Sequence, residues 1–145
     1  CLLEKVVKNV SNEKLIKIVN FYNKIYGLII DKNFKDANLY CIFLLEYLYC
    51  DSADSLKSKT IVEKLRVVLD KEEYSDEDIE KIIKTAYRLR SKSVHQYKGL
   101  SVDTLYNFNL YYFHPVEQLL KNSEKELFLL FLAINKIMMF ELSSL

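Results

Sequence analysis

Apolar side chains recur at helical spacing along most of the 145-residue chain. Apolar residues three and four positions apart predict a helix in each of several stretches. The stretch 35–50 is apolar on almost every face, which predicts a helix buried at the centre of the protein. The predicted helices cover 2–10, 14–30, 35–50, 57–69, 76–96 and 123 to about 142. With two Gly, one Pro and no convincing strand pair, the pattern predicts an all-α helical bundle of five or more helices.

Two predicted helix starts carry a specific signal. A Ser followed three residues later by an acid has the spacing of a capping box, in which each residue's side chain binds the other's backbone N–H. The two candidate boxes are Ser75 with Asp78, and Ser123 with Glu126. Both support a helix that begins immediately after the Ser.

Length and charge narrow the class of protein. Half of the residues are hydrophobic, and 145 residues suit a single domain with one core, here 1–145. The chain begins with Cys1 rather than Met, which favours a domain cut from a longer protein. The net charge of +1 excludes a global basic field that would bind any nucleic acid, so local fields must be judged separately.

The cysteines indicate a cytoplasmic protein, and no sequence motif indicates a metal or cofactor. Cys41 and Cys50 are nine residues apart in one apolar run, so on a helix they face opposite ways and predict buried thiols, not a disulfide. The run 37–50 is too short to cross a membrane, and 127–142 is interrupted by polar residues. No Asp/His cluster indicates a metal, and no Gly-rich loop indicates a nucleotide.

Two ionisable residues stand where apolar ones are expected. At 100° per residue, Arg90 falls about 20° from Ile79, in the middle of the apolar stripe of its helix. Glu46 interrupts the apolar run 37–50. Each needs a partner when buried, and the simplest resolution is an ion pair between two packed helices. The alternative is that Arg90 extends to solvent and Glu46 lies on a narrow wet strip.

The outer face of the same helix carries a second group of candidates. This face carries Arg88, Ser91 and His95, which follow one another at helical spacing. Arg88 is therefore a second candidate for contacting the same ligand as His95. Six acids lie within 72–80, whereas 81–100 holds six Lys or Arg and no acid. This gradient fits the helix dipole, and it also fits a phosphate-binding end beside a titratable His.

The segment "YRLRSKSVHQY" resembles the Arg-x4–6-His signature of the HEPN superfamily (higher eukaryote and prokaryote nucleotide-binding domains), with Arg90 and His95 in the motif positions. With the upstream "LYCIFLLEYLY", the chain looks most like the ApeA-like branch, in which Glu46 matches the Glu of an apolar helix. The likeness covers about 36–99. Ser91 stands where other branches prefer Asn, Asp or His, and Gln96 stands where Gly usually follows the His.

This resemblance implies a metal-independent endoribonuclease that acts on RNA as a homodimer, with two motifs facing one cleft, in antiviral defence or a toxin system. Arg90 and His95 would be catalytic, and Glu46, Ser91 and Arg88 would support them. The chain also resembles HEPN toxins paired with a minimal nucleotidyltransferase antitoxin, in which a Tyr at the position of Tyr97 is modified. The alternatives are a catalytically silent RNA-binding or dimerisation module, and a purely structural bundle.

Overall fold

The computed structural model describes residues 12–95 and 119–144, with the backbone alone for 92–95. These residues form five named helices and no strand: α2 (Glu13–Ile30), α3 (Phe34–Tyr49), α4 (Lys57–Val68), α5 (Asp76–His95) and α8 (Glu124–Ser143). The predicted all-α class is confirmed, and the predicted helix ends agree closely with the observed ones. The predicted helix over 2–10 lies outside the described residues.

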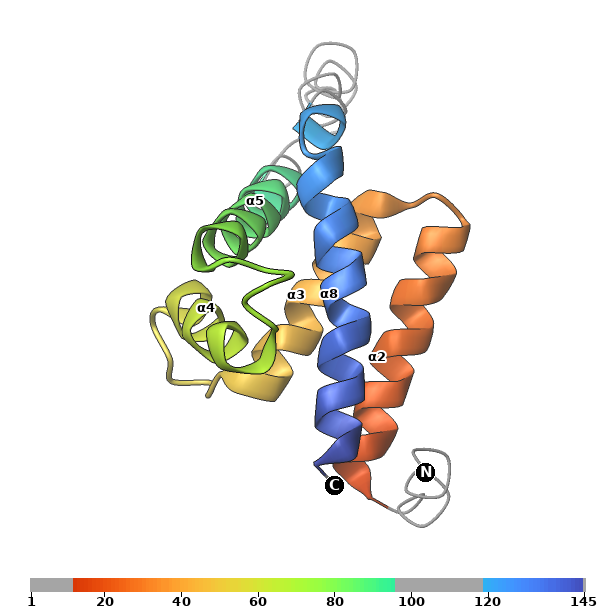
Figure 1. Ribbon diagram of the computed structural model, residues 1–145. Coiled ribbons are helices and arrows are strands. Elements are labelled where there is room, and N and C mark those ends of the chain that lie inside the picture. Colours follow the sequence, from red (N-terminus) through yellow and green to blue (C-terminus); the bar gives the residue numbers. More distant parts are fainter. Residues whose placement is uncertain (1–11, 96–118, 145) are drawn as a thin grey trace.

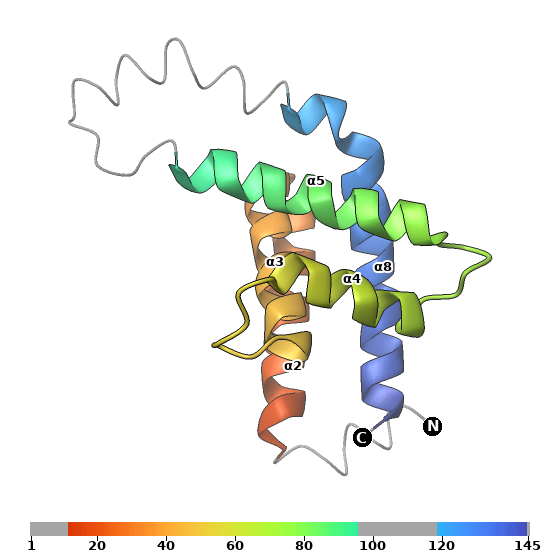
Figure 2. The ribbon, with the colours of Figure 1, turned by 90° about the vertical axis from the view of Figure 1, so that its left-hand side faces the viewer.

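The helices form two groups that cross each other. α2, α3 and α8 run along a common direction, with α2 antiparallel to the other two, and α4 and α5 lie across them on one side (Figures 1 and 2). α3 packs against each of the other four described helices. These contacts fit the apolar character of most of its positions, although the side chains of Phe34 and Tyr47 remain exposed.

The core is built from apolar side chains of all five helices. Burying one such side chain contributes about 1.5–3 kcal/mol. One fully buried residue from each helix, none more than 1% exposed, is Ile18, Leu44, Ile61, Ile83 and Ile137. The packing also fixes the α3–α5 crossing through a polar contact, because the buried Asn38 side-chain amide donates to the carbonyl oxygen of Ala86 at 3.0 Å.

One of the two predicted capping boxes forms. The backbone N–H of Asp78 donates to Ser75 Oγ at 3.1 Å, and the N–H of Ser75 donates to Asp78 Oδ2 at 3.4 Å, as predicted. The second prediction is wrong: Ser123 makes no side-chain cap, and Glu126 pairs with Lys81 at 3.3 Å. The chain is already helical over 119–122, and Ser123 has ψ 9° instead of the extended conformation of a capping residue.

The two described cysteines are free thiols, as predicted. Cys41 is fully buried and Cys50 partly buried. Burial raises the pKa of the Cys41 thiol strongly, and burial together with Asp54 and Glu46 raises the pKa of Cys50. None of the described helices combines the length and apolar character that crossing a bilayer requires.

Candidate functional site

The predicted pair between Glu46 and Arg90 forms at the crossing of α3 and α5. Nη1 of Arg90 donates to Oε1 of Glu46 at 2.7 Å. The Arg90 side chain is 33% exposed and the Glu46 side chain 15%, so the pair is partly buried and water reaches part of the arginine side chain. The prediction of an interhelical pair is confirmed, although water reaches the arginine more than full burial would allow.

Tyr87 completes the anchoring of Glu46. Its hydroxyl donates to the same Oε1 atom at 2.8 Å, from a position one helical turn before Arg90 on α5. Burial first, and then the hydrogen bond to Glu46, raise the pKa of the Tyr87 hydroxyl, which therefore remains a donor at neutral pH. The carboxylate thus accepts one charged and one neutral hydrogen bond from the same helix.

Further contacts hold the guanidinium in place. Its carbon lies 5.6 Å from the ring centre of Phe43 and 5.9 Å from that of Tyr87, both within the range of cation–π attraction. Lys57, the first residue of α4, places its Nζ 4.0 Å from Oε2 of Glu46. Glu46 therefore faces two cations.

Arg90 keeps unused hydrogen-bonding capacity. Only its Nη1 bonds to a described residue, and a guanidinium carries five N–H donors in a fixed fork. A partly exposed arginine with unused donors can donate to two oxygens of a phosphate. The geometry therefore fits the binding of an oxyanion beside the α3–α5 crossing.

Of the other predicted site residues on α5, Arg88 comes two residues before Arg90, and Ser91 and His95 follow it. Arg88 and Ser91 are exposed, and Arg88 has no ion pair with any described residue. His95 is the last residue of α5, within the stretch where only the backbone is described, and Tyr97 lies outside the described residues. The structure thus brings Glu46 and Arg90 together and places His95 five residues further along the same helix.

A groove of about 580 Å³ lies between α4 and α5 and borders this site. Tyr87 belongs to both, since it lines the groove and donates to Glu46. The lining is mixed in charge and chemistry: Ser58, Lys59, Val62, Glu63 and Arg66 from α4, and Glu80, Ile83, Lys84 and Tyr87 from α5. The groove therefore offers a mixed apolar and charged surface that adjoins the Glu46–Arg90 pair through Tyr87.

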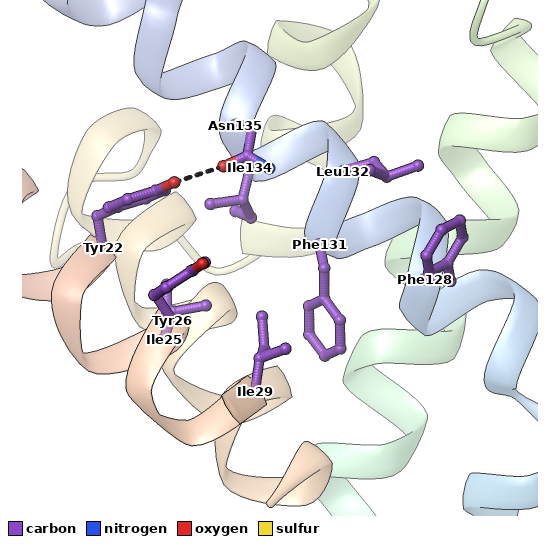
Figure 3. A pocket seen from close by; sticks show the side chains of 9 residues that line it. All are labelled: Tyr22, Ile25, Tyr26, Ile29, Phe128, Phe131, Leu132, Ile134 and Asn135. Carbon is purple, nitrogen blue, oxygen red and sulfur yellow. Dashed lines mark hydrogen bonds between the residues drawn. The ribbon is translucent and has the colours of Figure 1, made fainter. Parts of the chain in front are cut away.

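A second hollow, of about 170 Å³, lies between α2 and α8 and has a different character. Figure 3 shows apolar and aromatic side chains around it, with one polar contact, the 2.8 Å hydrogen bond from the Tyr22 hydroxyl to Oδ1 of Asn135. No charged side chain lines it. It lacks the charged groups that bind an anion, in contrast to Arg90 at the α3–α5 crossing.

The chain matches no family model, no curated protein and no solved structure. The candidate site therefore stands on its own geometry. Within the described ranges, no group of three or more His, Cys, Asp or Glu side chains is placed to hold a metal ion.

Sequence reasoning missed two partners of Glu46. Tyr87 was detectable, because it precedes Arg90 by three residues and so shares the face that meets α3. Lys57 was not, because its approach depends on the path of the loop between α3 and α4. The groove was also missed, because it exists only once α4 packs against α5.

Proposed function

We propose that this chain is a metal-independent endoribonuclease of the HEPN type that cleaves single-stranded or loop RNA. The observation that carries the proposal is the anchored Arg90, held by Glu46 and Tyr87 with donors left open, five residues before His95. The resemblance of the "RLRSKSVH" segment to the HEPN signature supports the same reaction.

The chemistry needs three groups. A base takes the proton of an RNA 2′-hydroxyl, the 2′-oxygen attacks the adjacent phosphorus, and the 5′-oxygen leaves with a proton from an acid. The products are a 2′,3′-cyclic phosphate and a 5′-hydroxyl. His95 serves as base or acid because imidazole titrates near neutrality, and Arg90 stabilises the negative charge that develops on the phosphate oxygens. Arg88 and Ser91 supply further donors from the exposed side of α5.

The active form is a homodimer in this proposal. Two proton-transfer groups are required, and the motif supplies one His per chain, so a second copy brings the other His95 to the same cleft. The setting is antiviral defence or a toxin system, with a fused domain or a cognate antitoxin as a further partner. In a toxin system, modification of Tyr97, two residues after His95, would block the site.

The test is cleavage of a mixed tRNA and mRNA pool, with the new ends mapped. His95→Ala is expected to lower the cleavage rate by about 10²–10⁴-fold, the usual loss for one general acid–base group. Cleavage is expected to persist in the presence of a chelator. The matched control is His114→Ala, which removes the other histidine of the chain and should cleave like the wild type.

Equal cleavage by the wild type and His95→Ala would refute the mechanism. Absence of cleavage by both, with RNA still bound, would favour the silent RNA-binding module. Scattering that shows a monomer both alone and with RNA would refute the shared cleft.

A further inference from the structure

The α4–α5 groove has an excess of uncompensated cations. Arg66 is balanced by acids of α5, since its Nη2 lies 3.6 Å from Glu80 Oε2 and its Nε lies 3.8 Å from Asp76 Oδ1. Lys59 and Lys84 line opposite walls, one from α4 and one from α5, and neither pairs with any described residue. The only unpaired acid in the lining is Glu63.

One end of the groove adjoins the Glu46–Arg90 pair. Lys59 lies in the first turn of α4. The carboxylate of Asp54 already serves the N-terminus of this helix, since it accepts from the Leu56 N–H at 3.0 Å and from the Thr60 hydroxyl at 2.7 Å, so the positive charge of the groove comes from its lysines and not from the helix dipole. At the same end of the groove, where Lys57 and Tyr87 both contact Glu46, Tyr87 connects the groove to Arg90 through Glu46. The groove therefore carries two lysines that pair with no described residue, and it adjoins the Glu46–Arg90 pair through Tyr87.

We infer that the α4–α5 groove binds the backbone of single-stranded RNA next to the scissile phosphate, with Lys59 and Lys84 each contacting a phosphate. This inference rests on the proposed ribonuclease function and adds the path of the substrate. Two facing lysines at the walls of an open groove suit a flexible charged chain, because ammonium groups contact phosphates as point charges without fixing a geometry. Few such contacts give weak, salt-dependent binding, which agrees with a net charge of only +1.

The test measures binding separately from cleavage. A short fluorescent 2′-O-methyl RNA without a stem cannot be cut through its 2′-oxygen, and its anisotropy with the full chain gives Kd as a function of salt. Single-strand binding loses about 0.7 in the slope of log K against log salt for each phosphate contact removed. The double variant Lys59→Ala/Lys84→Ala loses two such contacts. It should therefore flatten the slope by about 1.4 and weaken binding at low salt.

Two further variants make the test specific. Lys64→Ala with Lys125→Ala removes the same net charge from exposed lysines that do not line the groove, and it should bind like the wild type. Glu63→Gln removes the unpaired acid of the groove and should tighten binding. Equal weakening of binding by the two double lysine variants would overturn the inference. So would an unchanged salt slope in the Lys59→Ala/Lys84→Ala variant together with no effect of Glu63→Gln.

The outcomes also separate this inference from the ribonuclease proposal. RNA that binds through Lys59 and Lys84 but is never cleaved would support the groove and refute the enzyme. Cleavage that depends on His95, with the same KM in the Lys59→Ala/Lys84→Ala variant as in the wild type, would support the enzyme. The same result would overturn the inference that the groove binds RNA. No binding of the RNA by the wild-type chain at low salt would also overturn the groove.

Discussion

Replacing Glu46 by Gln is the most direct test of the α3–α5 crossing. The substitution keeps the size of the side chain and removes its charge, so Oε1 changes from a charged to a neutral acceptor for both Arg90 and Tyr87. A hydrogen bond to a charged group contributes about 1.5–3 kcal/mol, against about 0.5–1.5 kcal/mol for a neutral one. Only the Tyr87 bond becomes fully neutral, a loss of about 1–1.5 kcal/mol, while the Arg90 bond keeps its charged donor and loses the ion pair, about 0.5–1 kcal/mol at this exposure. Together these changes predict a loss of about 2 kcal/mol in the free energy of unfolding.

The exposure of Arg90 sets the upper limit of this effect. Breaking a fully buried ion pair costs about 3–5 kcal/mol, because the remaining charge has no solvent. One third of the Arg90 side chain is exposed, so water can solvate the released guanidinium and the loss stays below that range. Urea unfolding followed by circular dichroism gives the free energy, and the slope with denaturant should be unchanged. In a thermal scan the midpoint should fall by roughly 5–10 °C.

The matched control is Glu13→Gln, which removes an acid paired with Lys17 at 3.2 Å on the surface of α2, where Glu13 is 82% exposed. Such a pair contributes about 0.3–0.5 kcal/mol, so this variant should unfold almost like the wild type. A double-mutant cycle of Glu46→Gln with Arg90→Gln isolates the interaction. Effects that add within about 0.5 kcal/mol, or a single Glu46→Gln loss below that value, would refute the reasoning.

Two smaller predictions address local structure. Ser75→Ala should cost about 1 kcal/mol in unfolding free energy, because the Ser75 hydroxyl accepts from the Asp78 N–H. Ser123→Ala removes no side-chain cap and should cost much less. Equal losses in the two variants would contradict the difference between the two helix starts. Cys41 should resist alkylation in the folded protein at pH 8 and react on unfolding, because burial raises the pKa of its thiol, and peptide-resolved mass spectrometry would reveal any early labelling.

The parts of the fold that depend on local pattern were predictable. Helical periodicity located the five named helices, and the Ser75 box fixed the start of α5, because both signals act over a few neighbouring residues. The Ser123 box failed because the conformation of the preceding chain, 119–122, decided the backbone at that Ser. A capping motif specifies a helix start only when the chain enters from an extended conformation.

The candidate site divides in the same way. The Glu46–Arg90 pair was predictable because each charge is an anomaly in an apolar environment, and two unlike anomalies on helices that must pack have few other partners. Nothing in the sequence distinguishes Lys59 and Lys84 from other lysines, because exposed lysines are common on helix surfaces. They become a pair of groove walls only through the packing of α4 on α5, which periodicity does not specify.

The position of Arg90 decides how activity measurements on this chain are to be interpreted. Its guanidinium holds α3 and α5 together through Glu46 and is also the group proposed to bind phosphate. Loss of cleavage in an Arg90 variant would therefore not distinguish a missing phosphate contact from a loosened helix crossing. Arg88 is free of that ambiguity, because it is exposed and pairs with no described residue, and so are Lys59 and Lys84. Their charges can be removed without disturbing the anchor of Glu46, so changes in RNA binding or cleavage in those variants report on the substrate alone.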